Sequence, residues 1–141
     1  MNAQTDLEEF MQKAVMVTRL ILGLVFALFG LNVFVPFVPK PEMSEAAGSF
    51  FGALLGSGYF VPLLGVTELV AGIFLLAGIL VPLALTLLAP VVVNIVLFHV
   101  FLDPAGMPIA ILVLVLEVFL GWAYRDSFRG VLDLRAKPSR G

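Results

Sequence analysis

The sequence predicts an all-α fold: an integral membrane four-helix bundle with a short interfacial helix between spans 1 and 2 and an amphipathic N-terminal extension. Hydrophobic residues make up 61% of the chain and charged residues only 13%, against about a quarter in soluble domains. Two long stretches, 20–39 and 69–102, carry no formal charge. Since a membrane helix needs about 20 apolar residues, the second stretch is long enough for one crossing and most of another.

Residues 1–14 are expected to form an amphipathic cytoplasmic start. Thr5 and Glu8 have the spacing of a capping box, which predicts a helix that begins near Asp6. Apolar residues from Leu7 onward recur at helical spacing. This pattern is typical of a segment that lies on the lipid surface or packs under a bundle.

The four spans are expected over about residues 15–35, 59–80, 83–102 and 108–124. Pro36 and Pro39 end the first span. Residues 78–82 are the one place in the long uncharged stretch where the chain can turn, and residues 103–106 form a second turn. Between the first two spans, apolar residues of 42–56 recur at helical spacing opposite a polar face. This pattern predicts a short interfacial helix and not a crossing.

Four spans place both termini on one side of the membrane, and the basic residues indicate which side. Seven of the eight lie on the terminal side: Lys13, Arg19, Arg125, Arg129, Arg135, Lys137 and Arg140. Lys40 alone lies on the other side. The positive-inside rule therefore predicts that both termini are cytoplasmic, with 125–141 as a basic tail. The tail either sets topology and contacts lipid or binds a partner.

Three polar residues are predicted at one depth within the spans: Glu68, Glu117 and Asn94. An ionised carboxylate at the bilayer centre costs about 2.5 kcal/mol or more, so these groups should face the bundle interior and be hydrogen-bonded or protonated. Two such acids form a candidate proton relay or a site for a polar ligand. The alternative is interhelical polar bonding, with each acid paired to Asn94, a threonine or a carbonyl freed at Pro90.

A second polar level is predicted near the non-cytoplasmic ends of the spans, with His99 and Asn32. Asp103 follows His99 by one turn, and a carboxylate there would hold the imidazole in one tautomer with its other nitrogen free for proton exchange. The alternative is an interfacial histidine bonded to Asn32 or a carbonyl. Candidate catalytic residues are thus Glu68, Glu117 and His99, and candidate ligand-binding residues are Asn94, Asn32 and Arg19. Arg19 has a structural or lipid-headgroup alternative.

Composition excludes several kinds of chemistry. The chain has no cysteine, which removes disulfides, thiolate nucleophiles and Cys-ligated metal sites. One histidine cannot supply both axial ligands of a bis-histidine haem. The net charge of −2 does not favour nucleic acid as a partner. No metal-ligand pair, nucleotide motif or nucleophile elbow is present.

Glycines recur every seven residues along two spans, at Gly23 and Gly30 and again at Gly58, Gly65 and Gly72. Such stripes let the backbone of a neighbouring helix approach closely. We therefore expect helix packing, and not phosphate binding, to be their use.

The first span reads Arg19-x-x-x-Gly23-x-x-Phe26-x-x-x-Gly30, and the second reads Glu68-x-x-x-Gly72-x-x-Leu75-Leu76-x-Gly78. Over roughly residues 15–124 the chain resembles the DoxX family of small bacterial membrane proteins. The resemblance implies a four-helix bundle of the inner membrane, linked to thiosulfate:quinone oxidoreduction or to membrane oxidoreductase complexes. The family often has a lysine shortly after the Gly30 position, where this chain has Asn32-Val33.

Three hypotheses for function follow. The first is a DoxX-like membrane subunit that supports redox chemistry, with a quinone or small lipophilic ligand between the helices and a redox partner protein. The second is a small proton-coupled carrier in which Glu68 and Glu117 load and release protons while Pro90 and the glycine stripes let helices move. The third is a non-catalytic scaffold for a partner complex. Whether the chain is an enzyme and whether it forms a homo-oligomer are left open by the sequence.

Overall fold

The computed structural model describes residues 2–139 and contains no strand within that range. Its helices are α1 (Ala3–Phe34), α2 (Glu45–Gly56), α3 (Phe60–Ala77), α4 (Val81–Phe101) and α5 (Met107–Ala123), with 3-10 turns η1 (Pro104–Gly106) and η2 (Arg125–Phe128). Four helical segments are long and apolar enough to cross a membrane: α1, α3, α4, and η1 together with α5 (Pro104–Ala123). The predicted all-helical membrane class is confirmed.

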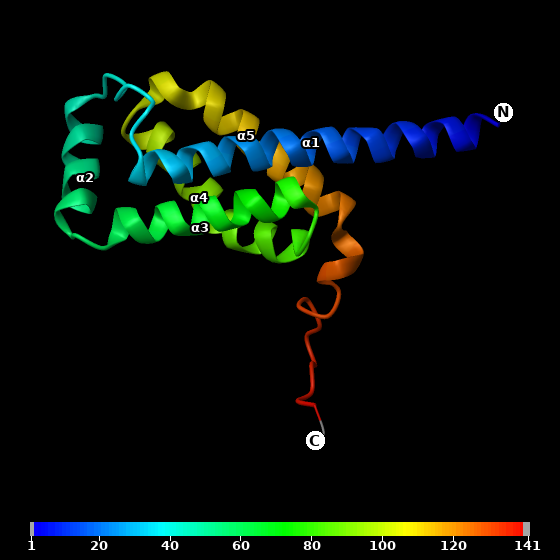
Figure 1. The fold of residues 1–141 in the computed structure, drawn as a ribbon. Coiled ribbons are helices and arrows are strands. Elements are labelled where there is room, and N and C mark those ends of the chain that lie inside the picture. Colours follow the sequence, from blue (N-terminus) through cyan, green and yellow to red (C-terminus); the bar gives the residue numbers. More distant parts are fainter. Residues whose placement is uncertain (1, 140–141) are drawn as a thin grey trace.

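The four long helices pack as a bundle in which α1 and α4 each contact both α3 and α5. Helices α3 and α5 therefore occupy diagonally opposite corners (Figure 1). The start of α1 and the end of α5 lie toward one end of the bundle, and α2 crosses the other end (Figure 1). We call these the terminal end and the α2 end.

Helix α1 begins earlier than the sequence predicted. It starts at Ala3, not near Asp6, and the capping box is not formed. The reason is that the carbonyl of Asn2 already accepts the amides of Thr5 at 2.9 Å and Asp6 at 3.2 Å, which places Thr5 inside the helix. Helix α1 runs unbroken through the predicted boundary between the amphipathic start and the first span, and its first turns project beyond the bundle (Figure 1).

The glycine stripes of α1 and α3 face one another. A Cβ built on Gly30 would lie 2.5 Å from the amide nitrogen of Leu69, and one built on Gly23 would lie 2.9 Å from the Cβ of Leu75. A Cβ on Gly72 would overlap the backbone of Ala27. Gly58 does not belong to the stripe, because it lies in the turn before α3 with φ +77°. Backbone contact between α1 and α3 is thus the closest packing in the bundle.

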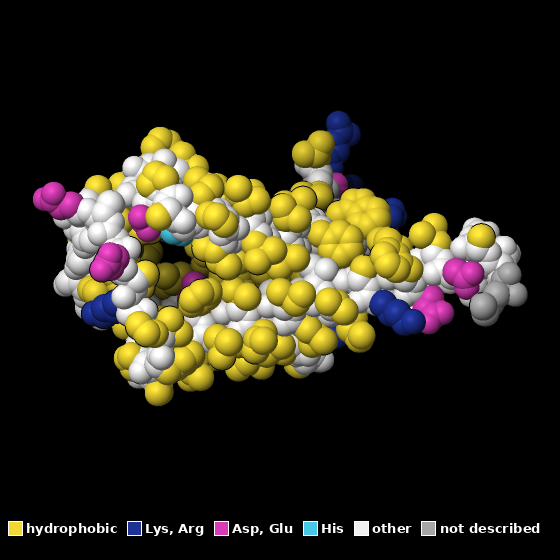
Figure 2. All heavy atoms as spheres, turned by 90° about the horizontal axis from the view of Figure 1, so that it is seen from above, with side chains coloured by type: hydrophobic (Ala, Val, Ile, Leu, Met, Phe, Trp, Pro, Cys, Tyr) yellow, Lys and Arg dark blue, Asp and Glu magenta, His cyan; other side chains and the backbone are white. Residues whose placement is uncertain are grey.

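The interior and the outer surface of the bundle are both apolar. Phe26, Leu75, Leu88 and Leu120 are fully buried and contribute to one core from all four long helices. Large apolar side chains are also exposed along the outside of these helices and cover much of the face seen in Figure 2. Such a surface is suited to contact with lipid chains, because no hydrophobic penalty arises there.

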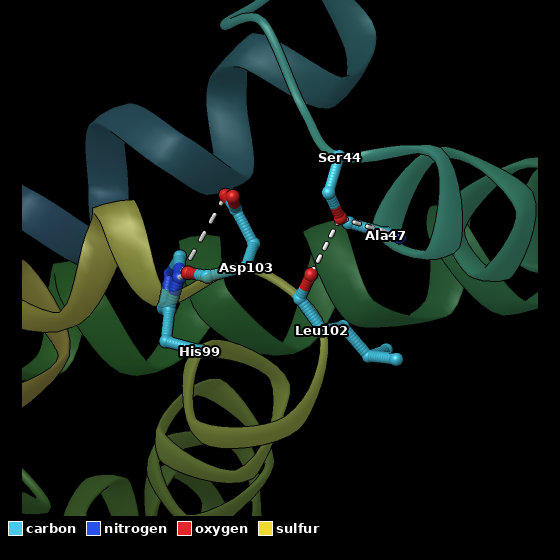
Figure 3. Close-up of polar contacts among 5 residues, drawn as sticks. All are labelled: Ser44, Ala47, His99, Leu102 and Asp103. Atoms are coloured by element: carbon cyan, nitrogen blue, oxygen red, sulfur yellow. Dashed lines mark hydrogen bonds and ion pairs between the residues drawn. The ribbon is translucent and has the colours of Figure 1, made fainter.

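Helix α2 is attached to the end of α4 by polar and aromatic contacts. The hydroxyl of Ser44 donates to the carbonyl of Leu102 at 2.5 Å and accepts the amide of Ala47 at 3.1 Å, so one side chain caps α2 and joins it to the bundle (Figure 3). The rings of Phe50 and Phe98 lie 6.0 Å apart. Ala47 is the one residue of α2 that is buried.

The turn predicted at residues 78–82 is found between α3 and α4. Gly78 ends α3 in the left-handed conformation with φ 72°, and Leu80 follows with φ 49°. Two left-handed residues reverse the chain direction within three positions. Helix α4 then continues through Pro90 to Phe101.

Candidate intramembrane site

Glu68 and Glu117 are the buried charged residues of the bundle. Each side chain belongs to a residue with only 8% of its surface exposed. Glu68 lies near the middle of α3 and Glu117 near the middle of α5, so their depths differ by roughly one helical turn or less. Both therefore face the interior from diagonal corners, as the sequence predicted for them.

Neither acid has a hydrogen-bond partner among residues 2–139, and Oε2 of Glu117 is completely buried without one. The threonines proposed as partners bond to their own helices instead. Thr67 donates to the carbonyl of Leu63 at 2.9 Å, and Thr86 donates to that of Pro82 at 2.8 Å. Interhelical polar bonding therefore does not account for the two acids.

Asn94 does not join the glutamates, although the sequence predicted that it would face the interior with them. Its side chain is exposed on α4 and lines a groove of about 350 Å³ with Phe50, Leu97 and Phe101. The physical reason is helical geometry. Asn94 follows the buried Val92 by two residues, which is about 200° around the helix and places it on the opposite face.

His99 is held by a main-chain carbonyl. Its Nδ1 lies 2.8 Å from the carbonyl oxygen of Asp103 and 4.0 Å from that residue's carboxylate (Figure 3). Because a carbonyl oxygen only accepts, Nδ1 is the donor, and Nε2 of the neutral ring carries a lone pair. The ring packs edge-on against Phe98 and lies directly over Gly106, where a Cβ would overlap it.

The molecule is hollowed near the α2 end. Figure 2 shows an opening there, with acidic and histidine side chains at its edge and an acidic side chain within it. The His99–Asp103 pair belongs to this end, because it lies where α4 ends and η1 begins. Polar side chains therefore lie at the opening near the α2 end (Figure 2).

Asn32 has a structural use. Its side-chain oxygen accepts the amides of Phe37 at 2.9 Å and Val38 at 2.8 Å, beyond the end of α1. These bonds cap the segment after the helix, where the amides have no helical partner. The side-chain oxygen is thus occupied by two hydrogen bonds. The prediction that Asn32 binds a ligand now rests on its side-chain amide nitrogen alone.

Arg19 lies at the terminal end of the bundle, where α3 ends and α4 begins. Its guanidinium packs against Gly78 in the α3–α4 turn, where a Cβ would lie 2.5 Å from Nη1. Arg19 also lines a groove of about 340 Å³ between α1 and the end of α5, together with Met11, Val15, Trp122, Tyr124 and Arg125. The grouping with Trp122 and Arg125 was missed from the sequence. One signal in the sequence could have revealed this grouping: Trp122, an interfacial tryptophan, lies three residues before Arg125 at the end of a span.

Within residues 2–139, no group of three or more histidine, aspartate or glutamate side chains is placed to hold a metal ion. The polar chemistry available in the interior is therefore that of two carboxyl groups, with one imidazole toward the α2 end. Carboxyl groups accept hydrogen bonds, donate them when protonated, and move protons.

Fold and interior together define a multi-pass membrane protein whose four-helix bundle encloses two unpartnered acids. The model of the DoxX family matches residues 14–100, which is more than half of the chain. The chain belongs to the DoxX family. The match includes Glu68 and His99, while Glu117 lies beyond it. Comparisons with curated proteins and with solved structures give no match.

Proposed function

We propose that this DoxX-family protein is a membrane subunit that supports quinone-linked or other redox chemistry, with its interior acids binding a polar head group. One observation carries the proposal: Oε2 of Glu117 is fully buried with no partner in residues 2–139. An unsatisfied buried polar group costs about 1–3 kcal/mol. A ligand that supplies the missing hydrogen bond recovers that free energy.

A quinone suits this interior for two reasons. Its ring carbonyls accept hydrogen bonds, which a protonated Glu68 or Glu117 donates, and both acids are at mid-helix depth. Its apolar tail is compatible with the outer faces of the bundle, which expose large apolar side chains. The opening near the α2 end supports entry of such a molecule (Figure 2).

Reduction of a quinone to a quinol takes two electrons and two protons. Glu68 and Glu117 are the proposed proton donors, and Nε2 of His99 is the proposed group that exchanges protons near the α2 end. The electrons come in this proposal from a redox partner protein, because the sequence has no cysteine and only one histidine to hold an electron-transfer centre. The products are then the oxidised partner, the quinol and two ionised carboxylates, which take up two protons again before the next turnover.

We propose that the protein lies in the bacterial inner membrane with both termini cytoplasmic. The N-terminal end of α1 and the C-terminal end of α5 both lie at the terminal end of the bundle (Figure 1). Six of the eight basic residues lie on that side within residues 2–139, namely Lys13, Arg19, Arg125, Arg129, Arg135 and Lys137. Arg140 lies outside the described residues. The excess supports a cytoplasmic orientation by the positive-inside rule.

Binding of a short-chain benzoquinone or naphthoquinone to the purified protein in nanodiscs tests the proposal. Glu117→Leu should weaken binding about tenfold, since the loss of a ligand hydrogen bond of about 1.4 kcal/mol is a factor of ten. Glu117→Gln keeps a donor and should stay within a few-fold of the natural protein. Glu42→Leu, an exposed acid outside the spans, is the matched control.

Absence of quinone binding by the natural protein, or equal binding by Glu117→Leu, overturns the proposal. A pH-dependent flux of small molecules into proteoliposomes, lost in Glu68→Gln, would favour the proton-coupled carrier instead. If the protein neither binds quinone nor supports a pH-dependent flux while the variants still fold, the two acids have a structural role only. That result would favour the non-catalytic scaffold.

A further inference from the structure

A second site is suggested by the groove at the terminal end, which is separate from the interior acids. It lies between the N-terminal half of α1 and the end of α5, and its volume is about 340 Å³. Met11, Val15 and Trp122 are apolar residues of its lining, and Arg19 and Arg125 are its two basic residues. A largely apolar groove with a basic residue on each side is compatible with an amphiphile that has an anionic head.

Arg19 lacks the partners that a partly buried arginine normally has. Its Nε is completely buried without a hydrogen-bond partner, and no carboxylate of residues 2–139 lies within ion-pair distance. Contact with Gly78 holds the guanidinium in place, because the missing side chain leaves room for it. Burying an unpaired charge is costly, so an anion at this position is favourable.

Arg125 is fixed on the opposite side of the groove. Its Nη1 donates to the carbonyl of Trp122 at 3.0 Å, and its guanidinium carbon lies 4.8 Å from the centre of the Trp122 ring. Cation–π stacking uses the face of the guanidinium and leaves most of its in-plane N–H donors available. The neighbouring Asp126 does not neutralise it, since that carboxylate pairs with Arg129 at 2.8 Å.

We propose that this groove binds the head group of an anionic phospholipid, with the phosphate against Arg19 and Arg125 beside Trp122 and the acyl chains directed toward the membrane interior. Guanidinium groups match phosphate oxygens in geometry and charge. A lipid is favoured over a free anion because the walls are apolar and because Trp122 marks the level of the membrane interface.

Trp122 is the single tryptophan of the chain, so the tryptophan fluorescence comes from a residue that lines this groove. The full-length protein is reconstituted at equal lipid fractions with brominated phosphatidylglycerol or with brominated phosphatidylcholine, whose bromines quench a tryptophan that they contact. The natural protein should select the anionic lipid. Each arginine should contribute about fivefold, which is the effect of one basic residue near an anionic lipid.

Arg125→Gln, at an exposed position, should lower the selectivity about fivefold, and Arg19→Met should do the same if it folds. Arg19→Lys keeps the charge and should retain most of the selectivity. Lys13→Gln, an exposed basic residue of α1 paired with Glu9 at 2.6 Å, is the control and should change nothing.

Equal quenching by the two lipids in the natural protein, or undiminished selectivity in Arg125→Gln, overturns the proposal. Loss of selectivity on addition of inorganic phosphate at constant ionic strength also overturns it, because it would assign the groove to a free anion.

Discussion

Gly30 of α1 and Leu69 of α3 touch through their backbones: a Cβ built on Gly30 would lie 2.5 Å from the amide nitrogen of Leu69. This approach fixes how α3 is rotated about its axis. Leu69 is directed toward α1, and Glu68, one residue earlier and about 100° around the helix, is thereby turned into the interior. The position of the buried acid thus depends on a glycine in another helix.

Replacing Gly30 by alanine should therefore destabilise the bundle. The added methyl group meets backbone atoms, which cannot move aside as a flexible side chain would, and overpacking costs about 1–3 kcal/mol or more. Gly121→Ala in α5 is the matched control, because nothing lies within 4 Å of a Cβ there. It should leave stability unchanged or raise it by up to about 1 kcal/mol through helix propensity. Unfolding in denaturing detergent gives the stability of both variants. Equal effects of the two substitutions would contradict the close contact between Gly30 and Leu69.

Replacing Glu117 by leucine should stabilise the ligand-free protein. The substitution removes a buried oxygen without a partner and fills the space with apolar atoms, for a gain of about 1–3 kcal/mol in the free energy of unfolding. Glu42→Leu, in the exposed segment before α2, should give no comparable gain. A loss of stability in Glu117→Leu would show that the acid is a structural link between helices.

Asn32→Ala should destabilise the end of α1 by about 1–3 kcal/mol, because two amides lose their acceptor. Asn32→Asp keeps an oxygen in the same place and should retain most of the stability. Amide hydrogen exchange at Phe37 and Val38 measures directly how far these two amides are protected. Unchanged protection of both amides in Asn32→Ala would contradict a capping role.

Ser44→Ala should loosen α2 from the bundle. The hydroxyl both caps α2 and donates to the carbonyl of Leu102, so its loss should cost about 1–2 kcal/mol. Ser49→Ala, at an exposed position in the middle of the same helix, is the control. Hydrogen exchange should increase over Glu45–Gly56 in the first variant and not in the second; equal exchange in both would show that Ser44 does not hold the helix.

The spans could be predicted from the sequence because an uncharged stretch of that length has no place in water. Glu68 could also be oriented, since it shares a stripe with Gly65 and Gly72, which lie three and four residues away. Asn94 could not. Its neighbours in α4 are apolar on every side, so no periodicity indicates which face is buried, and only the packing against α3 and α5 decides it.

The groupings at the two ends of the bundle were harder to predict. The contact between Ser44 and Leu102 and the groove shared by Arg19 and Arg125 join residues far apart in the chain. Local spacing cannot reveal such neighbours. His99 shows a subtler limit: its spacing to Asp103 suggested that the carboxylate holds the imidazole, with a carbonyl as the alternative, and the nearer acceptor is the main-chain carbonyl of Asp103.

Infrared difference spectroscopy of the carboxyl groups tests most directly whether the interior acids form a ligand site. Adding a short-chain quinone to the reconstituted protein should shift the carboxyl bands of the natural protein and of Glu42→Gln. The shift should be reduced in Glu68→Gln and in Glu117→Gln and absent in the double variant. Carboxyl bands that do not respond to the quinone, or a response that survives in the double variant, would contradict the account.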